Sequence, residues 1–264
     1  MFTEEQRQRL LQRFAKKMQA GIKKAQAINS RPLPKSIVPM FNILKPGKAG
    51  NADISFYRVT ETGAAVHTMS QAASGRPEMA IKPGIYSMLK VDGELMMTDT
   101  PHEIRTNLDL IENARGDVLI AGLGLGMVLV PLLLNRKVKS VTVIEKSKGV
   151  IKLVKPRIQK WRDHQGIIGA KPAPLYIINA DIFEWDPGEL SWDTIYFDIW
   201  PTIGMKNLEG GNKLKRKFKK NLRNRGWMAV WVEKEIRAYN RQDARELALL
   251  KKNMKKMKEE RAAS

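Results

Sequence analysis

The sequence predicts an α/β protein: a doubly wound, mostly parallel sheet, preceded by a small antiparallel β subdomain and an N-terminal helix. Apolar, strand-like runs alternate with helical patterns from about residue 116 onward, and such alternation is typical of parallel sheets. Before that point, short β-like runs are joined by a hairpin signal, and the chain begins with helical periodicity. The 264 residues are enough to bury a large core without disulfides or a metal.

The N-terminal helix is predicted over residues 3–28. Among Arg, Gln and Lys residues, this stretch places an apolar stripe at helical spacing, formed by Leu10, Leu11, Phe14, Met18 and Ile22. Residues 30–48 contain four prolines, and this density of proline is typical of a linker or extended arm.

The small β subdomain is predicted between residues 53 and 98. Its β-like runs cover residues 54–60, 64–69, 85–91 and 94–97. Asp92-Gly93 separates the last two runs, and this dipeptide is a strong hairpin signal.

The larger sheet follows a predicted helix that begins at Thr100. Thr100-Pro-His-Glu103 has the sequence of a capping box with proline at the first helical position, so we expect this helix to run to about Ala114. Strands are then predicted at residues 118–122, 140–145, 175–179, 194–198 and 227–232, with helices at 126–134, 147–161 and 207–224. Residues after 232 are charged and helical in composition.

The positive charge of the chain is concentrated in three segments. The sequence has 47 Lys and Arg against 27 Asp and Glu, a net charge of +20, and residues 1–36, 213–225 and 251–264 carry +7, +8 and +4 of it. Basic segments on a near-neutral body are typical of a protein that binds a polyanion such as a nucleic acid. Solvated surface helices and tails would look the same, and no nucleic-acid-binding motif decides between the two interpretations.

Composition excludes several classes of chemistry. The chain has no cysteine, which excludes disulfides, thiolate zinc sites, iron–sulfur clusters and a cysteine nucleophile. The three histidines have no ligand-like spacing, which argues against a metal site. No apolar run approaches the roughly 20 residues of a membrane span, and no secretion signal is visible. We therefore expect a cytoplasmic protein with no membrane partner, whose oligomeric state is open.

The strongest local motif is a glycine-rich turn. The apolar run that starts at Val118 leads into Gly122, Gly124 and Gly126, and a helical pattern follows. Glycines at such a turn let the backbone approach a ligand and leave amide groups free to bind it. The dinucleotide fingerprint requires a further glycine where this chain has Met127, which argues against NAD.

Three acidic residues follow predicted strands. Glu145 ends the second strand, Asp181 follows the third and Asp198 ends the fourth. The carboxyl ends of parallel strands meet at one edge of the sheet, where ligands bind in open α/β folds. A carboxylate at the position of Glu145 can accept hydrogen bonds from both hydroxyls of an adenosine ribose. A carboxylate at the position of Asp181 can accept a hydrogen bond from the adenine amine.

From about residue 116 to 232 the pattern resembles the class I S-adenosylmethionine-dependent methyltransferases. Within that superfamily it is most similar to spermidine synthases, which also have a small β subdomain and a run like that from Leu89 to Asp99, so the resemblance reaches back to about residue 54. It implies a Rossmann-like domain at residues 100–235, between a basic helix and arm (1–48), a β subdomain (49–99) and a basic helical tail (236–264). In that superfamily the sheet usually ends with two further strands. We find neither in this sequence, so a sheet shortened to five strands is expected.

The resemblance also implies a set of functional residues. The three glycines would line the methionine part of S-adenosylmethionine, and Asp198 would face the reacting centre. The expected cofactor-binding residues are Gly122, Leu123, Gly124, Gly126, Glu145, Lys146, Asp181, Ile182 and Asp198. Asp198 and Asp99 are the candidate catalytic residues, although Asp99 can also be a cap or turn residue.

Two departures argue against aminopropyl transfer. Spermidine synthases carry an aspartate where this chain has Leu125, and a second aspartate where it has Pro201. The first holds the amine of the decarboxylated cofactor and the second helps to bind the polyamine. An ammonium group without a carboxylate in a closed site costs several kcal/mol, on the order of a lost ion pair.

The segment from Asp198 to Pro201 also resembles, imperfectly, the loop of methyltransferases that act on exocyclic amines. Trp200 could stack on a base, and Trp200 and Pro201 are therefore candidate substrate residues, while a core or lid role for Trp200 is the alternative. The leading hypothesis is an S-adenosylmethionine-dependent methyltransferase whose acceptor is unknown, with DNA or RNA as one candidate. The alternatives are a polyamine aminopropyltransferase-like enzyme and a catalytically inactive nucleic-acid-binding protein on the same fold.

Overall fold

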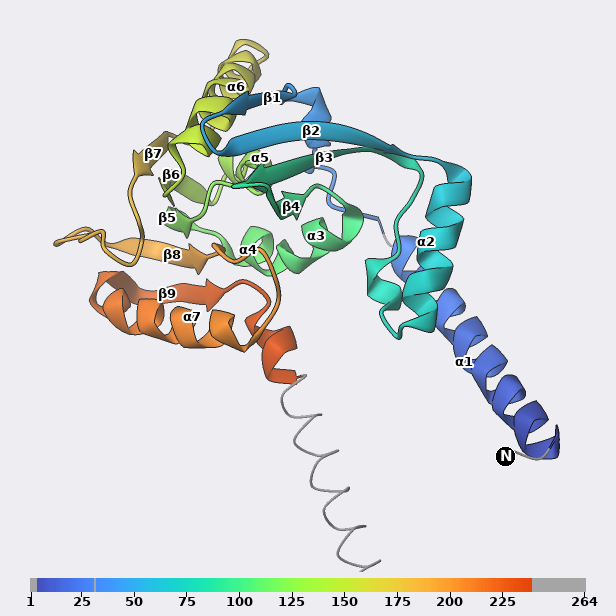
Figure 1. Cartoon of the computed structure of the whole chain (residues 1–264). Coiled ribbons are helices and arrows are strands. Elements are labelled where there is room, and N and C mark those ends of the chain that lie inside the picture. Colours follow the sequence, from blue (N-terminus) through green and yellow to red (C-terminus); the bar gives the residue numbers. More distant parts are fainter. Residues whose placement is uncertain (1–3, 31, 239–264) are drawn as a thin grey trace, which may run out of the picture.

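The computed structural model describes residues 4–30 and 32–238, and these form two sheets flanked by helices (Figure 1). A four-stranded antiparallel sheet has the order β1-β2-β3-β4, and a five-stranded parallel sheet has the order β7-β6-β5-β8-β9. The chain crosses from β5 outward to β7 and then returns to β8 on the other side. The α/β class, the doubly wound sheet, its five strands in the described part of the chain and the preceding β subdomain are confirmed.

The N-terminal helix α1 (Glu4–Ser30) is also confirmed, and only its second half packs against the body. Ala25 is fully buried, and Gly21 lies so close to Ala72 that an added Cβ would be 3.0 Å from the Ala72 carbonyl oxygen. Leu10 and Phe14 in the first half are more than half exposed. The proline-rich arm that follows contains a single short helix, η1 (Met40–Asn42).

The small sheet consists of β1 (Gly47–Ala49), β2 (Ala52–Val59), β3 (Gly84–Val91) and β4 (Glu94–Thr98). Asp92 and Gly93 both have positive φ angles between β3 and β4, as the predicted hairpin requires.

The strand predicted at residues 64–69 is wrong, because that segment lies in helix α2 (Glu61–Ala73). The Thr60 hydroxyl caps this helix by accepting from the Gly63 amide, and Ala64 and Ala72 form its buried side. The strand-like appearance of the segment came from its β-branched residues Val66 and Thr68, and Val66 is exposed. A short 3-10 helix, η2 (Pro77–Met79), connects α2 to β3.

The helix predicted from residue 100 to 114 is broken into α3 (Pro101–Thr106) and α4 (Leu108–Asn113). The Asn107 side chain lies at the break, where it donates to the Glu103 carbonyl and accepts from the Tyr196 hydroxyl. The predicted capping box does not form, since the Thr100 hydroxyl bonds the Thr98 hydroxyl and caps no amide. Glu103 is therefore free of the capping role that the sequence suggested.

The parallel sheet is built from β5 (Gly116–Ala121), β6 (Val138–Glu145), β7 (Leu175–Asn179), β8 (Trp192–Phe197) and β9 (Leu222–Val230). Helix α5 (Leu129–Leu133) is shorter than predicted and α6 (Lys148–Ile167) is longer. Alternate residues of β5 face opposite layers: Val118 and Ile120 belong to the core that α5 and α6 cover, whereas Leu119 and Ala121 belong to the core under α7. Helices therefore cover both faces, as expected for this fold.

The helix predicted at residues 207–224 ends early. Helix α7 (Met205–Lys217) is followed by a short 3-10 turn, η3 (Lys219–Asn221), and β9 then begins. Phe218 is fully buried against Phe197, and the Asn221 amide donates to two carbonyls of the loop before β8. These contacts fix the chain at a point where helix propensity alone would continue the helix. A helical turn at 233–238 follows β9, and the rest of the predicted tail lies outside the described residues.

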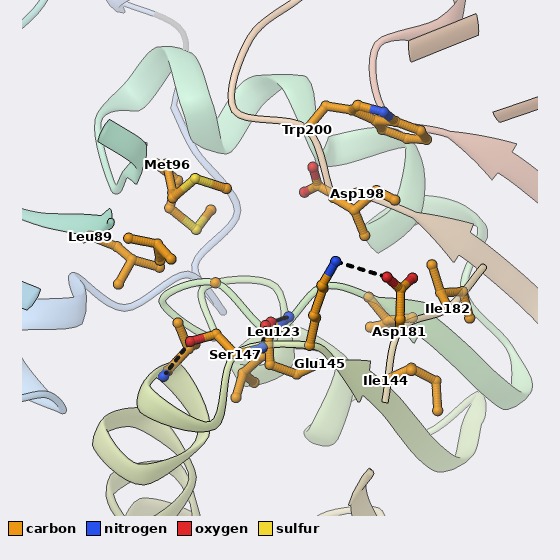
Figure 2. A pocket seen from close by; sticks show the side chains of 18 of the residues that line it. Leu89, Met96, Leu123, Ile144, Glu145, Ser147, Asp181, Ile182, Asp198 and Trp200 are labelled. Carbon is orange, nitrogen blue, oxygen red and sulfur yellow. Dashed lines mark hydrogen bonds and ion pairs between the residues drawn. The ribbon is translucent and has the colours of Figure 1, made fainter. Parts of the chain in front are cut away.

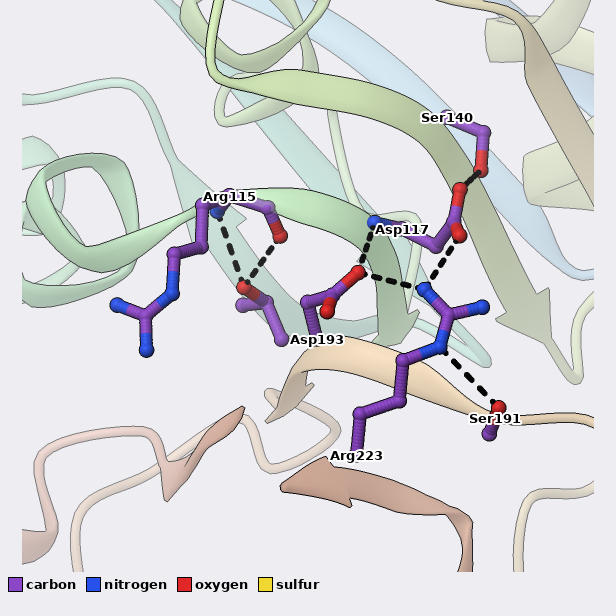
Figure 3. Close-up of polar contacts among 7 residues, drawn as sticks. Arg115, Asp117, Ser140, Ser191, Asp193 and Arg223 are labelled. Carbon is purple, nitrogen blue, oxygen red and sulfur yellow. Dashed lines mark hydrogen bonds and ion pairs between the residues drawn. The ribbon is translucent and has the colours of Figure 1, made fainter. Parts of the chain in front are cut away.

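The amino ends of the strands are joined by a polar network (Figure 3). One guanidinium nitrogen of Arg223 on β9 lies 2.6 Å from a carboxylate oxygen of Asp117 on β5 and 2.6 Å from one of Asp193 on β8. Ser140 on β6 donates to the other Asp117 oxygen. Gly116 has a positive φ of 60° and no room for a Cβ beside Asp193. This network ties four strands together at one end of the sheet and leaves the carboxyl ends available for a site.

Candidate active site

A cavity of about 730 Å³ lies at the carboxyl ends of the parallel strands, beneath the small sheet (Figure 2). The two sheets share one core, which includes Ile54 and Leu89 of the small sheet and Ile120 of the large one. The loops after β5, β6, β7 and β8 form one wall of the cavity, and β3, β4 and α3 form the other. Its volume is in the range of small-molecule and cofactor sites.

Most of the predicted cofactor residues line this cavity. They are Gly122, Leu123, Gly124, Glu145, Lys146, Asp181, Ile182 and Asp198. Gly126 is not among the lining residues; an added Cβ there would lie 3.1 Å from Ile158, so this glycine serves the packing of the loop on α6. Trp200 lines the cavity, whereas Pro201 is exposed and does not.

The glycine loop has the backbone geometry that the sequence indicated. Gly122 and Gly124 have positive φ angles of 97° and 50°. A Cβ on Gly122 would lie 2.0 Å from the Asp198 carbonyl oxygen, and one on Gly124 would lie 2.3 Å from the Met97 sulfur. Met97 also accepts from the Leu125 amide at 3.1 Å. The turn therefore needs glycine at both positions, and a methionine of the small sheet holds its tip.

Glu145 is fixed at the end of β6 by two backbone amides. One carboxylate oxygen accepts from Leu123 and the other from Ser147, each at 2.7 Å. Each carboxylate oxygen offers a second acceptor position, so both can also bind hydroxyl groups that enter the cavity. The rigid placement beside the glycine loop fits the ribose-binding role predicted for this residue.

Asp181 forms an ion pair with Lys146 (Figure 2). The Lys146 ammonium lies 2.9 Å from one Asp181 oxygen, and the other oxygen accepts from the Phe183 amide at 3.0 Å. The hydrogen bond from Lys146, together with that amide, lowers the pKa of Asp181. The Lys146 side chain is 79 % exposed, and an exposed ion pair costs about 1 kcal/mol or less to open. Asp181 can therefore accept from a ligand once the lysine moves aside.

Asp198 and Glu103 face the same cavity, the first from the loop after β8 and the second from α3. In Figure 2 the Asp198 carboxylate points into the cavity below Trp200. Burial raises the pKa of Asp198 to about 8, with a further contribution from the nearby Glu103 charge. Burial also raises the pKa of Glu103 to about 7. Neither carboxylate has a hydrogen-bond or ion-pair partner among the side chains and amides of residues 4–30 and 32–238.

The role of Glu103 was missed at the level of the sequence. The spacing Thr100-x-x-Glu103 indicated a helix cap, and that pattern explained the glutamate without any site. The signal that could have pointed to Glu103 is its place in α3, directly after β4. Strand β4 contributes Met96 and Met97 to the cavity, so the next element along the chain lies near it. Only the tertiary structure shows that Glu103 of α3 lines the same cavity as Asp198.

Asp99 lies outside the cavity. Its carboxylate accepts hydrogen bonds from the Met40 amide at 2.8 Å and from the Ser87 amide at 2.5 Å. Asp99 is only 5 % exposed. Burial raises its pKa, and the two amide hydrogen bonds oppose that rise. Asp99 thus connects the proline-rich arm to β3, and this position fits a structural role in place of the catalytic one that was considered.

The cavity is acidic although the protein is basic. Its lining carries six carboxylates, on Asp92, Glu94, Glu103, Glu145, Asp181 and Asp198, against the two lysines Lys146 and Lys148. Lys146 pairs with Asp181, and Lys148 begins α6 directly after the Glu145 loop. Within the described residues, no three His, Asp or Glu side chains are grouped as metal ligands, and no helix there is long and apolar enough to cross a membrane.

The residues present fit S-adenosylmethionine. Gly122 and Gly124 leave space that a Cβ would fill, and the Glu145 and Asp181 carboxylates supply acceptors for ribose hydroxyls and for an adenine amine. Ile144, Ile182 and Val150 provide apolar lining on the same side of the cavity, as a flat aromatic base requires.

The chain is similar in fold to S-adenosylmethionine-dependent methyltransferases and to spermidine synthase. Spermidine synthase from Thermotoga maritima aligns over 71 % of this chain and 55 % of its own, with 15 % identity and a TM-score of 0.40. An S-adenosylmethionine-dependent methyltransferase from Clostridium acetobutylicum ATCC 824 aligns over 48 % of this chain and 46 % of its own, with 18 % identity and a TM-score of 0.31. Coclaurine N-methyltransferase aligns over 48 % and 33 %, with 17 % identity and a TM-score of 0.33.

These matches concern the fold alone, and the chain spans about half the length of the first structures that it matches. No family model matches the sequence. No curated protein matches it either.

The two departures from spermidine synthases can be located in the structure. Leu125 is completely buried in the core and does not line the cavity. Pro201 lies on the surface. Neither position therefore supplies a carboxylate to the cavity, and Glu103 enters it from a different element.

Proposed function

We propose that the protein is an S-adenosylmethionine-dependent methyltransferase. The observation that carries the proposal is the arrangement of Glu145 and Asp181 on neighbouring strand ends, with Gly122 and Gly124 beside them in one cavity. This arrangement matches an adenosine whose ribose lies at Glu145 and whose amine lies at Asp181. Asp198 then lies at the far side of the glycine loop, where the acceptor would be.

When bound, S-adenosylmethionine supplies an electrophilic methyl group. Glu145 would hold the ribose hydroxyls, and Asp181 would accept from the base amine after Lys146 swings into solvent. Asp198 would take a proton from the acceptor, because its pKa of about 8 matches a base that works near neutral pH. Trp200 would close the acceptor side of the cavity.

The test is calorimetric titration of the full chain with S-adenosylmethionine and with its product, S-adenosylhomocysteine. We expect micromolar binding, about −7 to −8 kcal/mol. Glu145→Gln should weaken it by about 1–3 kcal/mol, because the ribose loses a charged acceptor. Glu112→Gln, an exposed glutamate on α4, is the matched control. Absence of heat and of a thermal shift at millimolar ligand would reject the cofactor assignment.

A polyamine aminopropyltransferase is the second candidate, since the fold is shared with spermidine synthase. Leu125 and Pro201 argue against it, because they stand where spermidine synthases carry the two carboxylates. The same titration decides the matter: tighter binding of decarboxylated S-adenosylmethionine than of the intact cofactor would favour aminopropyl transfer.

We also propose that the basic surface binds nucleic acid, independently of the cavity. In the segment 213–225, Lys213, Arg216, Lys219 and Lys220 are exposed and form no ion pair with the described residues. Lys215 and Lys217 differ: Lys215 pairs with Glu233, and Lys217 donates to the Ile182 and Phe183 carbonyls. The segment 251–264 lies outside the described residues. If nucleic acid does bind while S-adenosylmethionine does not, the inactive binding protein becomes the better description.

Salt dependence tests the nucleic-acid proposal. For duplex DNA, log affinity should fall linearly with log salt, with a slope of about −0.9 for each phosphate contacted. Changing Lys213, Arg216, Lys219 and Lys220 to Gln should flatten the slope, whereas Lys215→Gln should leave it unchanged and lower the melting temperature. Absence of binding at about 50 mM salt would assign these side chains to ordinary solvated surface.

A further inference from the structure

We propose that the acceptor is a small, positively charged amine, and that Glu103 and Asp198 bind it and take up its proton. This inference rests on the proposed methyltransferase function and names its substrate class. It places the acceptor in the part of the cavity between α3 and the loop after β8, under Trp200.

The first observation is that two half-buried carboxylates line one cavity and have no hydrogen-bond or ion-pair partner among the described residues. A carboxylate withdrawn from water is normally compensated by hydrogen bonds or by a cation. Asp181 and Glu145 in the same cavity have such partners, and Asp99 behind it accepts from two amides. Glu103 and Asp198 have none among the described residues, and burial disfavours the charge of both. A cationic ligand would supply the missing compensation.

The second observation is the chemistry around the pair. An alkylammonium group has three donors, which two carboxylates can accept. Trp200 also lines this cavity, with its indole against Gly210 of α7, and an indole face attracts a cation. Leu89, Met96 and Met127 add an apolar wall, which suits the carbon chain of a small amine.

The same charges argue against a nucleic acid as the acceptor in this cavity. A polynucleotide would bring phosphates to an opening that carries Asp92 and Glu94 in addition to the inner carboxylates. Like charges at such distances are unfavourable. The exposed lysines of α7 and η3 can still attract nucleic acid elsewhere, so the two ligands would use different parts of the molecule.

The reaction balances with the residues present. The bound ammonium first gives one proton to the Asp198 carboxylate, which frees the nitrogen lone pair. The nitrogen then forms a bond to the methyl carbon while the carbon–sulfur bond breaks, and sulfur keeps that electron pair. The positive charge passes from sulfur to nitrogen, so the product is a methylated ammonium ion, and Asp198 later releases its proton to water. Glu103 holds the ammonium group during the first step.

The experiment uses n-butylamine as a probe, with n-butanol as its uncharged counterpart. Each is titrated by calorimetry into the full chain saturated with S-adenosylhomocysteine, at pH 7 and in two buffers of different ionisation enthalpy. We expect butylamine to bind, butanol not to bind, and the amine to displace up to about one proton from the carboxyl pair into the buffer. Proton release separates this site from a general preference for cations.

Glu103→Gln should weaken butylamine binding by about tenfold or more and reduce proton release, because a charged acceptor is lost. Asp198→Asn should also weaken the amine, and both variants should keep their affinity for S-adenosylhomocysteine within about twofold. Glu112→Gln should behave as wild type. Melting temperatures recorded on each preparation show that the variants are folded.

Equal binding of butanol and butylamine, or an unchanged amine affinity in Glu103→Gln, would overturn the inference. Displacement of bound butylamine by a single-stranded oligonucleotide would also overturn it, in favour of a nucleic-acid acceptor. If S-adenosylhomocysteine binds but the amine does not, this inference fails while the proposed function stands. If the amine binds to protein that takes up no S-adenosylhomocysteine, the proposed function fails and the amine site stands.

Discussion

Asp198 lies directly after β8, and no backbone amide or cation of the described chain binds its carboxylate. If it only capped the turn before Pro201, it would accept amide hydrogen bonds there, and the structure has none at this side chain. We therefore expect Asp198→Asn to lower turnover by about 10²–10⁴-fold, because a positioned base contributes about that factor. Cofactor affinity should change by less than about 1 kcal/mol.

Turnover and melting temperature measured on one preparation check this prediction. A loss of activity that merely follows a loss of folded protein would indicate a structural role. A fully active, stable Asp198→Asn variant would remove the residue from the catalytic set.

Among the site's side chains, the sequence predicted those that follow parallel strands and missed those that come from other elements. Glu145, Asp181 and Asp198 could be found because the ends of parallel strands necessarily share one edge of the sheet. Glu103 could not, because its place depends on how α3 packs against the large sheet. The ion pair of Lys146 with Asp181 was also invisible, since it joins two loops that are distant in sequence.

Asp99 connects two elements, the η1 turn of the N-terminal arm and strand β3. Asp99→Asn keeps the size of the side chain but faces one of the two amides with an NH₂ group, which leaves a buried donor unpaired. We expect a loss of about 1–3 kcal/mol in the free energy of unfolding, measured by urea denaturation. Activity per folded molecule should be unchanged.

The control for Asp99 is Asp92→Asn, which alters an exposed aspartate of the adjoining hairpin and should leave stability nearly unchanged. If Asp99→Asn is as stable as wild type but has lost its turnover, the catalytic role considered for this residue would be correct after all.

Strands β5 to β8 could be predicted closely, because strands buried on both faces are nearly continuous apolar runs. Strand β9 begins at Leu222, five residues before the predicted strand, because the residues that follow Leu222 are polar and exposed. Helices were predicted less well, for reasons that are specific to each. Helix α2 contains Val66 and Thr68, which suggested a strand, yet Thr60 caps the segment and Ala72 packs on Gly21 of α1. Helix α7 stops at Lys217 because burial of Phe218 turns the chain, which charge and propensity cannot reveal.

The stability of the whole molecule should depend on pH in an unusual way. The folded-state pKa values of Asp198 and Glu103 are raised to about 8 and about 7. Between about pH 4.5 and 8 the folded protein therefore holds protons that the unfolded chain releases, so these groups lower stability as pH rises through this range. Their contribution is greatest below the unfolded pKa values.

Melting curves of wild type and of the double variant Glu103→Gln, Asp198→Asn check this dependence. The variant should gain about 2–4 °C relative to wild type at pH 8 and nothing at pH 4. Curves that stay parallel from pH 4 to pH 8 would show that the two carboxyls ionise normally.

Within the described residues, strand β9 is hydrogen-bonded to β8 alone, so its outer edge is an open row of backbone donors and acceptors. An open edge of this kind invites pairing with a second chain and aggregation. The beginning of β9 counters that hazard. Exposed Arg225 places positive charge along it and adopts a left-handed conformation, and the pairing with β8 is irregular at the same place. A charged, kinked edge cannot accept a flat neighbouring strand, so the residues that complete the sheet also limit its growth into larger assemblies.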